Sequence, residues 1–316
     1  MKKLIITMDT EGDNLWSWKN GDPIYTENTL YLQRFQSLCE EYGFKPTWLT
    51  NYEMICDPRY IDFIVKVEER RTGELGMHLH AWNNPPEHEL PIYNSGAPYL
   101  IEYPDYVMEQ KIALLTEQIV TRTGIKPVSH RAGRWAMNQK YFELLDKYGY
   151  KVDCSVTPHI NWNSSVGQSE NATGSDYSNY PTTPYTVKNT SVLEVPVTVI
   201  RSHKIFAENG IKGTLKACYH AASGHTLWLR PNGSNLRQMM YVADKTLGSE
   251  NDYLMFMLHS SELMPAGSPT FKTEEDIEKL YSDMTRLFEY LQGNYEGVTL
   301  RDYRKETLEN NGKCNI

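Results

Sequence analysis

The sequence of 316 residues predicts an α/β fold, a complete or incomplete (β/α) barrel of parallel strands. Apolar runs of strand length alternate with helix-like runs from one end of the chain to the other, which is typical of a parallel sheet with crossover helices. About eight strand-like runs favour a barrel over an open sheet. The length agrees, because single α/β barrels often run past about 250 residues.

The predicted strands are short apolar runs bounded by turn-forming residues. The first, residues 3–9, opens the chain with the sequence KLIITMD. The others lie at residues 44–50, 74–80, 127–131, 151–155, 192–200, 253–259 and 298–300. One of the eight can lie outside the main sheet, so the barrel is expected to have seven or eight strands.

The segments between most of these strands show helical periodicity. Residues 27–42 place four apolar side chains on one face, and Gly43 can end this helix. Asp57 and Pro58 suit the N-cap and first turn of a helix that reaches about residue 71. Further helices are expected at residues 104–123, 138–148, 235–247 and 274–291.

We expect residues 1–316 to form a single domain, because no linker and no internal repeat interrupts the pattern. Two long insertions stand out at about residues 81–103 and 157–190. Loops of this length inside a compact domain are usually functional or disordered. Both insertions follow strands, so in a barrel they would lie over the catalytic face.

The charge pattern excludes some partners. The net charge is −8, the pI is about 5.6, and no basic stripe is present, so neither nucleic acid nor an anionic membrane is expected as a partner. No apolar stretch approaches the length needed to span a bilayer. The sequence does not predict the oligomeric state.

The chain is expected to work in the cytoplasm. Acidic residues from Asp9 onward end the first apolar run before it could serve in a signal peptide. The cysteines form no CxxC pair, and their odd number argues against a disulfide framework, so reduced thiols are expected at Cys39, Cys56, Cys154, Cys218 and Cys314.

Two short motifs at strand ends point to a metal. Asp9-Thr10-Glu11 ends the first strand, and residues 76–80, GMHLH, end a later one with two histidines. Side chains at i and i+2 of a strand face the same way. Two imidazoles and one carboxylate with open coordination positions are typical of a catalytic divalent metal, so we predict that Glu11, His78 and His80 are the ligands. Taken alone, an Asp-x-Glu sequence is more often a turn, and a histidine at a strand end is more often an ordinary hydrogen-bonded residue.

Position along the strands strengthens this hypothesis. Polar residues fall at the carboxyl ends of predicted strands, where βα-barrel active sites are built, namely Asp9, Glu11, His78, His80, Arg131, Asp153 and His259. Polar residues with unrelated structural roles would not be expected at the same end of so many strands.

These motifs resemble those of the polysaccharide deacetylase superfamily, of the carbohydrate esterase family 4 type. Asp9-Thr10-Glu11 resembles its first motif, and Gly76-Met77-His78 its second. Residues 131–135, RAGRW, resemble the third motif, residues 153–155 the strand with an aspartate after it, and residues 256–260, FMLHS, the last. The resemblance implies a distorted (β/α) barrel, a bound divalent metal and hydrolysis of N-acetyl groups on sugars.

The chain departs from the family pattern at two places. Its first motif separates the two acids by Thr10, as in the branch with an Asp-x-Asp or Asp-x-Glu form. Its second motif has Trp82 where the family has a histidine four residues after His78. His80 is therefore expected as the second histidine ligand, with His88 or Asp13 as alternatives. Zn²⁺ is expected first, with Co²⁺, Ni²⁺ and Fe²⁺ as other options.

The resemblance also implies roles in catalysis. Asp9 would be the general base, His259 the general acid, and Arg131 would pair with Asp9. Asp153 would orient a neighbouring group, although a turn former is an equal interpretation. A sugar pocket would use Arg134 and Trp135, and Trp228 with Arg230 could join it or lie at the edge of the core.

The predicted function is a metal-dependent N-deacetylase acting on a cytoplasmic precursor of a surface glycan. Whether the sugar is nucleotide-linked, lipid-linked or free stays open. Three alternatives stay open. The chain could hydrolyse another C–N bond, in a cyclic amide or a ureide. It could be a non-catalytic carbohydrate-binding protein. It could also be an iron oxygenase, which shares the ligand set but is disfavoured by the alternation of strands and helices.

Overall fold

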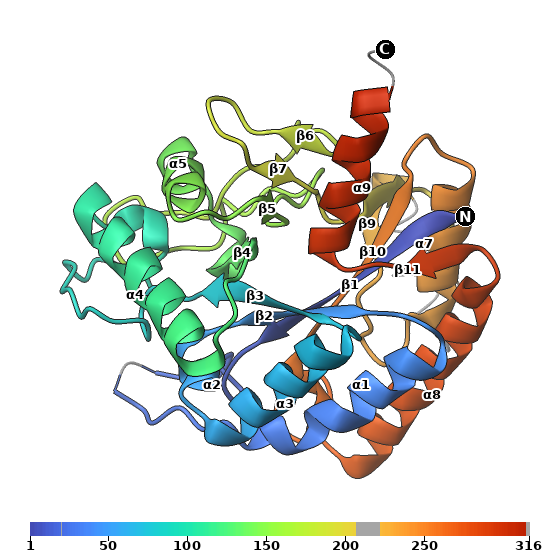
Figure 1. Cartoon of the computed structure of the whole chain (residues 1–316), viewed down its shortest axis with the longest axis horizontal. Helices are drawn as coiled ribbons and strands as arrows, with labels where there is room; N and C mark the ends of the chain where they lie inside the picture. Colours follow the sequence, from blue (N-terminus) through green and yellow to red (C-terminus); the bar gives the residue numbers. More distant parts are fainter. Residues whose placement is uncertain (20, 207–221, 314–316) are drawn as a thin grey trace.

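The computed structural model describes residues 1–19, 21–206 and 222–313, and it has the predicted distorted (β/α) barrel. A curled, mostly parallel sheet forms half of a barrel with helices on its outer side (Figure 1). The strands follow one another as β10 (Tyr253–His259), β1 (Lys2–Thr10), β2 (Pro46–Thr50), β3 (Glu74–Leu79), β4 (Ser129–Ala132), β5 (Val152–Asp153), β7 (Leu193–Glu194) and β6 (Tyr185–Thr186). One more strand, β11 (Tyr295–Gly297), pairs with the start of β1.

The predicted helices begin and end close to the expected residues. The described helices are α1 (Leu32–Glu41), α2 (Tyr52–Ile55), α3 (Pro58–Arg70), α4 (Asp105–Thr123), α5 (Gln139–Lys147), α7 (Leu236–Leu247), α8 (Glu274–Gln292) and α9 (Leu300–Lys313). Of these, α2 and α9 were not predicted. Short 3₁₀ turns are η1 (Glu27–Tyr31), η2 (Leu100–Glu102), η3 (Gly133–Trp135) and η4 (Ser260–Leu263). The predicted cap of α3 is present, since the Asp57 side chain accepts a hydrogen bond from the Arg59 amide.

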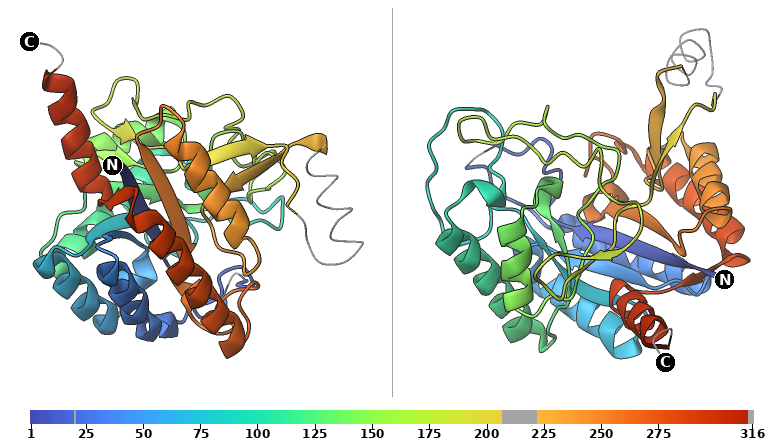
Figure 2. Two further views of the ribbon diagram at one scale, coloured as in Figure 1. Left: turned by 90° about the vertical axis from the view of Figure 1, so that its right-hand side faces the viewer. Right: turned by 90° about the horizontal axis from the view of Figure 1, so that it is seen from above.

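Two strand predictions were wrong. The run at 192–200 is divided, because Pro196 has no amide hydrogen to donate to a ladder; β7 stops at Glu194 and the chain continues into β8 (Val199–Ser202). That strand pairs with β9 (His225–Trp228) in a hairpin that projects from the body of the molecule (Figure 2). The run at 298–300 lies just after β11, and Leu300 already begins α9.

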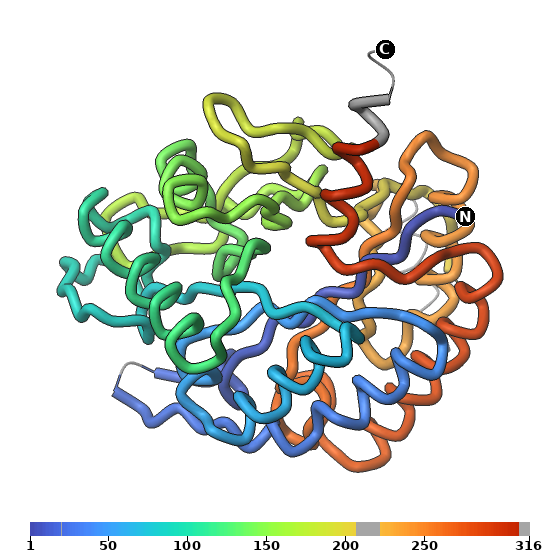
Figure 3. The backbone as a smooth tube through the Cα atoms, in the orientation of Figure 1, coloured from blue at the N-terminus to red at the C-terminus, as the bar shows by residue number. Residues whose placement is uncertain are grey.

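Irregular segments bridge the free edge of β10, which explains why the barrel is distorted. The Met255 amide donates to Thr198 Oγ1 at 2.9 Å, and the Met257 amide donates to the Leu229 carbonyl oxygen at 3.0 Å. Continuous strand pairing is replaced here by side-chain and single backbone contacts. The backbone trace in Figure 3 shows β1, in dark blue, running through the middle of the molecule.

Alternation along β1 decides which side chains reach the barrel interior. Leu4, Ile6 and Met8 pack in the large cluster beneath the helices, whereas Ile5 belongs to a second cluster. Residues two apart on a strand share a face, so Asp9 points to the same side as Ile5. The apolar pattern of the strand thereby carries the Asp9 carboxylate into the interior.

The two predicted insertions are joined to each other. The Tyr99 hydroxyl donates to the Ser165 carbonyl oxygen at 2.9 Å, and the Glu102 carboxylate accepts from the Ser169 amide at 2.7 Å. The single-domain organisation stays a prediction.

Within the described residues no helix is long and apolar enough to cross a membrane. Cys39, Cys56 and Cys154 are free, and Cys218 and Cys314 lie outside the described residues.

Candidate metal centre and active site

The carboxyl ends of β10, β1, β3 and β4, with β2 between β1 and β3, bring the predicted polar residues together. Asp9 on β1 is the register partner of His259 on β10, and His78 on β3 is the partner of Arg131 on β4. Parallel strands end at the same edge of a sheet, so these side chains converge. The site lies at the end of the barrel where the sequence predicts it.

Glu11, His78 and His80 form a compact cluster. Glu11 Oε2 lies 2.8 Å from His80 Nε2 and 3.5 Å from His78 Nε2, and the two Nε2 atoms are 3.0 Å apart. All three side chains are buried, and among the described residues theirs is the group of metal-ligating side chains that could hold an ion. Such convergence of one carboxylate and two imidazole nitrogens fits a divalent metal.

The ring of His78 has a tautomer suited to ligation. Its Nδ1 lies 2.9 Å from the Arg131 carbonyl oxygen, which can only accept, so Nδ1 carries the proton and Nε2 presents a lone pair to the cluster. Burial and the neighbouring His78 lower the pKa of His80 to about 4, so the imidazole of His80 is neutral at neutral pH. Burial disfavours an ionised Glu11, yet the surrounding histidines hold the pKa of Glu11 well below its usual range. Burial opposes the charged form of His78, but the Asp9 and Glu11 carboxylates raise the pKa of His78 above its ordinary value. An ionised Glu11 and a neutral His80 suit a metal, whereas His78 would have to lose a proton as the metal binds.

The two alternative ligands lie elsewhere. The Asp13 carboxylate accepts hydrogen bonds from the Asn28 amide at 3.0 Å and the Glu27 amide at 2.9 Å, which fixes the start of η1. His88 packs against the rings of Tyr103 and Tyr106. Neither belongs to the cluster. Trp82, at the position where the family has histidine, packs on His80 with 4.1 Å between ring centroids and 52° between the ring planes.

Arg131 fixes the orientation of Asp9. Its Nη1 donates to Asp9 Oδ1 at 2.6 Å, its Nη2 to Thr7 Oγ1 at 2.9 Å, and its Nε to the Cys154 carbonyl oxygen at 3.1 Å. Burial opposes the ionised form of Asp9, but the guanidinium lowers the pKa of this carboxyl below its ordinary value. Asp9 is therefore an anion with Oδ1 paired and Oδ2 turned elsewhere.

His259 faces the same space from the other side. Its Nε2 lies 3.8 Å from Asp9 Oδ2 and 4.0 Å from Glu11 Oε1. Its Nδ1 lies 2.9 Å from Glu262 Oε2 and 3.2 Å from Arg230 Nη2. Nδ1 cannot donate and accept at once, and the shorter contact with a carboxylate makes it the donor to Glu262.

Glu262 and Trp16 are site residues that the sequence analysis missed. Glu262 also accepts from the His259 amide at 3.0 Å, which closes a capping box around η4. The spacing of three residues between His259 and Glu262 was a usable signal for this contact. Trp16 meets the His259 ring edge-on at 4.9 Å, and nothing local in the sequence indicated that.

Asp153 is buried beside Arg131, and its partners are His130 and Ser155. Asp153 Oδ2 lies 2.6 Å from His130 Nδ1 and 2.9 Å from Ser155 Oγ. The position next to His259 Nδ1 is occupied by Glu262, so any orienting role of Asp153 would act on a different group. Its part in catalysis stays a prediction.

Of the residues predicted for a sugar pocket, Arg134 is engaged by the insertions. Its guanidinium donates to Ser165 Oγ at 3.0 Å, to the Val166 carbonyl oxygen at 2.8 Å and to the Ala97 carbonyl oxygen. It also lies 4.0 Å above the centre of the Tyr99 ring. Arg134 thus fastens one insertion to the other.

The remaining three residues predicted for the sugar pocket lie near the site. Trp135 and Trp228 are adjacent, with 6.1 Å between ring centroids. Arg230 contacts His259 and lies 3.7 Å from Glu262 Oε1. Sugar binding by these side chains stays a prediction.

A cavity of about 1430 Å³ lies next to Trp82, which packs on His80, although Asp9, His259 and the three cluster residues are not among its lining residues. Trp18 and Trp82 line it with their rings stacked 6.2 Å apart, and Trp82 links it to His80. Glu53 also lines it, accepting from the Gly12 amide at 2.5 Å and from Asn83 Nδ2 at 2.7 Å, and burial raises the pKa of Glu53 to about 7. Aromatic faces and amide groups are suited to sugar rings.

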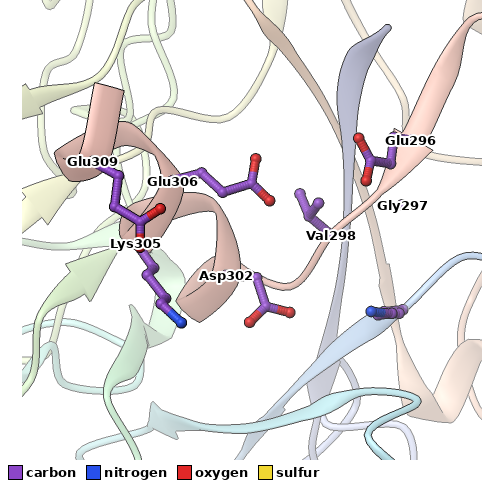
Figure 4. A pocket seen from close by; sticks show the side chains of 8 residues that line it. Glu296, Gly297, Val298, Asp302, Lys305, Glu306 and Glu309 are labelled. Carbon is purple, nitrogen blue, oxygen red and sulfur yellow. The ribbon is translucent and has the colours of Figure 1, made fainter. Parts of the chain in front are cut away.

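A smaller pocket of about 320 Å³ lies at the other end of β1, between β11 and α9 (Figure 4). Its charged side chains include Glu296 and Glu306, both of which pair with Lys3 at 2.7 and 2.6 Å. No histidine is among its lining residues.

Comparisons with known proteins identify the fold. No protein-family model and no curated protein matches the sequence. A candidate glycoside hydrolase/deacetylase from Parabacteroides distasonis is 10% identical over 96% of this chain and 70% of its own, with a TM-score of 0.61. A candidate polysaccharide deacetylase from Mycobacterium smegmatis is 12% identical over 98% of this chain and 92% of its own, with a TM-score of 0.55.

A GH57 branching enzyme from Thermococcus kodakaraensis also matches, at 12% identity over 96% of this chain and 71% of its own, with a TM-score of 0.55. At these identities the likeness establishes the fold, which is the one found in polysaccharide deacetylases and predicted by the motifs. Because the same fold carries a branching enzyme, the reaction has to be argued from the site.

Proposed function

We propose that this chain is a metal-dependent hydrolase that removes N-acetyl groups from a sugar. One observation carries the proposal: the Glu11, His78 and His80 cluster opens onto a space that Asp9 Oδ2 and His259 Nε2 share. A metal site, an anionic base and a histidine acid are the three parts that amide hydrolysis by an activated water needs.

Glu11, His78 and His80 would hold the metal. When bound, a divalent ion would supply Lewis acidity, polarising the acetamide carbonyl and acidifying the attacking water. Asp9 accepts the proton of that water at Oδ2, because its Oδ1 is paired with Arg131. Arg131 keeps Asp9 ionised and fixes the direction in which its free oxygen points.

His259 donates a proton to the departing amine from Nε2, which lies close to Asp9 and Glu11. Glu262 accepts the Nδ1 proton and so fixes the orientation of the ring. Its Nδ1 is thus paired, whereas Nε2 is left to face the substrate. Base and acid therefore approach the reacting amide from two adjacent strands.

We propose a glycan precursor in the cytoplasm as the substrate, with the rest of the sugar in the cavity lined by Trp18 and Trp82. The free cysteines of the described part agree with a reducing compartment. Arg134 and Arg230, which could have met a phosphate, are engaged by protein groups. A nucleotide or lipid carrier would have to be recognised elsewhere.

The deciding experiment combines metal analysis with acetate release. The purified protein, loaded separately with Zn²⁺, Co²⁺, Ni²⁺ or Fe²⁺, is assayed on N-acetyl sugars, their nucleotide- and lipid-linked forms, and chitin-like polymers. Acetate release from a soluble or lipid-linked precursor supports the proposal. Turnover of cyclic amides or ureides instead, or binding of sugars without turnover in every metal form, would establish one of the alternatives.

A further inference from the structure

Asp153 holds both chain neighbours of Arg131. Its Oδ2 accepts from His130 Nδ1 at 2.6 Å, and His130 directly precedes Arg131. The same oxygen accepts from Ser155 Oγ at 2.9 Å, and Ser155 Oγ in turn accepts from the Ala132 amide at 2.8 Å. The Asp153 carboxylate therefore anchors the backbone on either side of the arginine that orients Asp9.

The protonation of His130 is set by its two partners. The Tyr141 hydroxyl lies 2.9 Å from His130 Nε2, and Nδ1 lies against a carboxylate. Burial lowers the pKa of His130 below its ordinary value, so the ring is neutral with its proton on Nδ1. His130 therefore donates to Asp153 without adding a positive charge that could neutralise a second acid.

A second buried carboxyl group lies next to Asp153. Glu194 on β7 is the register partner of Asp153 on β5, and both side chains are fully buried. Glu194 Oε1 accepts from the Val156 amide at 3.0 Å, whereas Oε2 receives no hydrogen bond from any donor in the described part of the chain. Two adjacent buried carboxyl groups cannot both be ionised at low cost.

The number of donors decides which of the two carries a proton. Asp153 accepts three hydrogen bonds, from His130 and from the amide and hydroxyl of Ser155, whereas Glu194 accepts one. We infer that Glu194 is a protonated acid whose Oε2–H donates to Asp153, and that this pair positions Arg131 and, through it, Asp9. The positioning role rests on the proposed function of Asp9 as the base.

The surroundings of Glu194 support a neutral acid. Burial and the Asp153 carboxylate raise the pKa of Glu194 well above its ordinary value, whereas hydrogen bonds from His130 and Ser155 lower the pKa of Asp153 despite burial. Arg131 is the one cation that faces Glu194 from the described residues around it, and it is already paired with Asp9. The other titratable groups facing Glu194 are neutral at neutral pH, namely Cys154, Tyr177, Tyr185 and Tyr253.

Infrared spectroscopy tests the protonation directly. At pH 7 the wild-type protein should show the C=O stretching band of a buried carboxylic acid that is missing from Glu194→Gln. The Gln side chain can donate to Asp153 and accept from Val156, so this variant should fold. Identical spectra in this region would overturn the shared proton. The readout needs neither a metal nor a substrate, so it stands even if deacetylase activity is absent.

Kinetics test the positioning role. Glu194→Gln should keep kcat within about twofold, whereas Glu194→Leu and Ser155→Ala should lower kcat by on the order of tenfold to a hundredfold, because misplacing a reacting group costs that much. Metal content and KM should not change. Glu74→Gln is a control, since Glu74 is another buried glutamate but lies at the start of β3.

The kinetic outcomes separate the two proposals. Wild-type kcat in Ser155→Ala, or a loss of kcat in Glu194→Gln as large as in Glu194→Leu, would overturn the positioning role. If the wild-type protein releases no acetate with any metal, the proposed function fails, and an infrared band lost in Glu194→Gln would still establish the protonated pair.

Discussion

Asp9 and His259 occupy paired positions on adjacent parallel strands, and Asp9 Oδ2 lies 3.8 Å from His259 Nε2. In each of these side chains the atom that faces away from the other is hydrogen-bonded to a further charged residue. Arg131 binds the far oxygen of Asp9, and Glu262 binds the far nitrogen of His259. The two atoms that face each other are thus the ones available to a substrate.

Replacing His78 with Ala should lower the metal content sharply, because it removes one of three ligands that converge on one point. Elemental analysis after gel filtration measures this. His88→Ala is the matched control and should bind metal like the wild type. Full occupancy in His78→Ala, or loss of metal in His88→Ala, would contradict the ligand assignment.

Asp9→Asn should keep the fold and the metal but lower kcat by about a hundred- to ten-thousand-fold, the usual contribution of a general base. The Asn side chain can still accept from Arg131, but it cannot take up a proton. Acetate release and metal content are measured on the same preparation. Near-normal kcat would show that Asp9 is a structural partner of Arg131.

Glu262→Ala should lower kcat by on the order of tenfold to a hundredfold, because His259 loses the acceptor of its Nδ1 proton. The metal content should stay unchanged. Glu275→Ala, an exposed glutamate at the start of α8, serves as the control. Equal kcat in the two variants would remove Glu262 from the site.

Arg134→Ala should loosen the two insertions, because its guanidinium bonds to residues of both. Limited proteolysis should then cut within residues 81–103 and 157–190 sooner than in the wild type. Arg122→Ala, which alters an exposed arginine of α4, should leave the digestion pattern unchanged. Wild-type resistance in Arg134→Ala would contradict the clamp.

Because of Lys111, the free energy of unfolding should change with pH in the alkaline range. Burial lowers the pKa of Lys111 from 10.5 to about 8, and its ammonium group donates to the Asn84 and Pro86 carbonyl oxygens. Between these two pKa values the unfolded chain binds more protons than the folded one, so the free energy of unfolding should rise with pH. Urea unfolding of the wild type and Lys111→Met across this range measures the difference between them. A difference that falls or stays constant would reject the assignment.

Local pattern was enough to predict most of the fold and the convergence of Glu11, His78 and His80; their binding of a metal stays a prediction. The apolar runs located β1, β2, β3 and β10 closely, because nearly every residue of these strands is buried. The spacing of His78 and His80 already implied one shared face. Where pattern failed, at residues 192–200, a proline inside an apolar run divided what looked like one strand.

By itself the sequence determined which residues stand at strand ends, because that depends on neighbours along the chain. Which of them meet was decided only by the tertiary structure, since strand order and register join residues far apart in sequence. Register set Asp153 against Glu194, and the turn after β10 carried Glu262 to His259. Arg134 likewise bonds to two loops, and no local sequence signal indicates that these loops lie close together. Burial raises the pKa of Glu194 and lowers that of Arg134, and this burial exists only once the chain has folded.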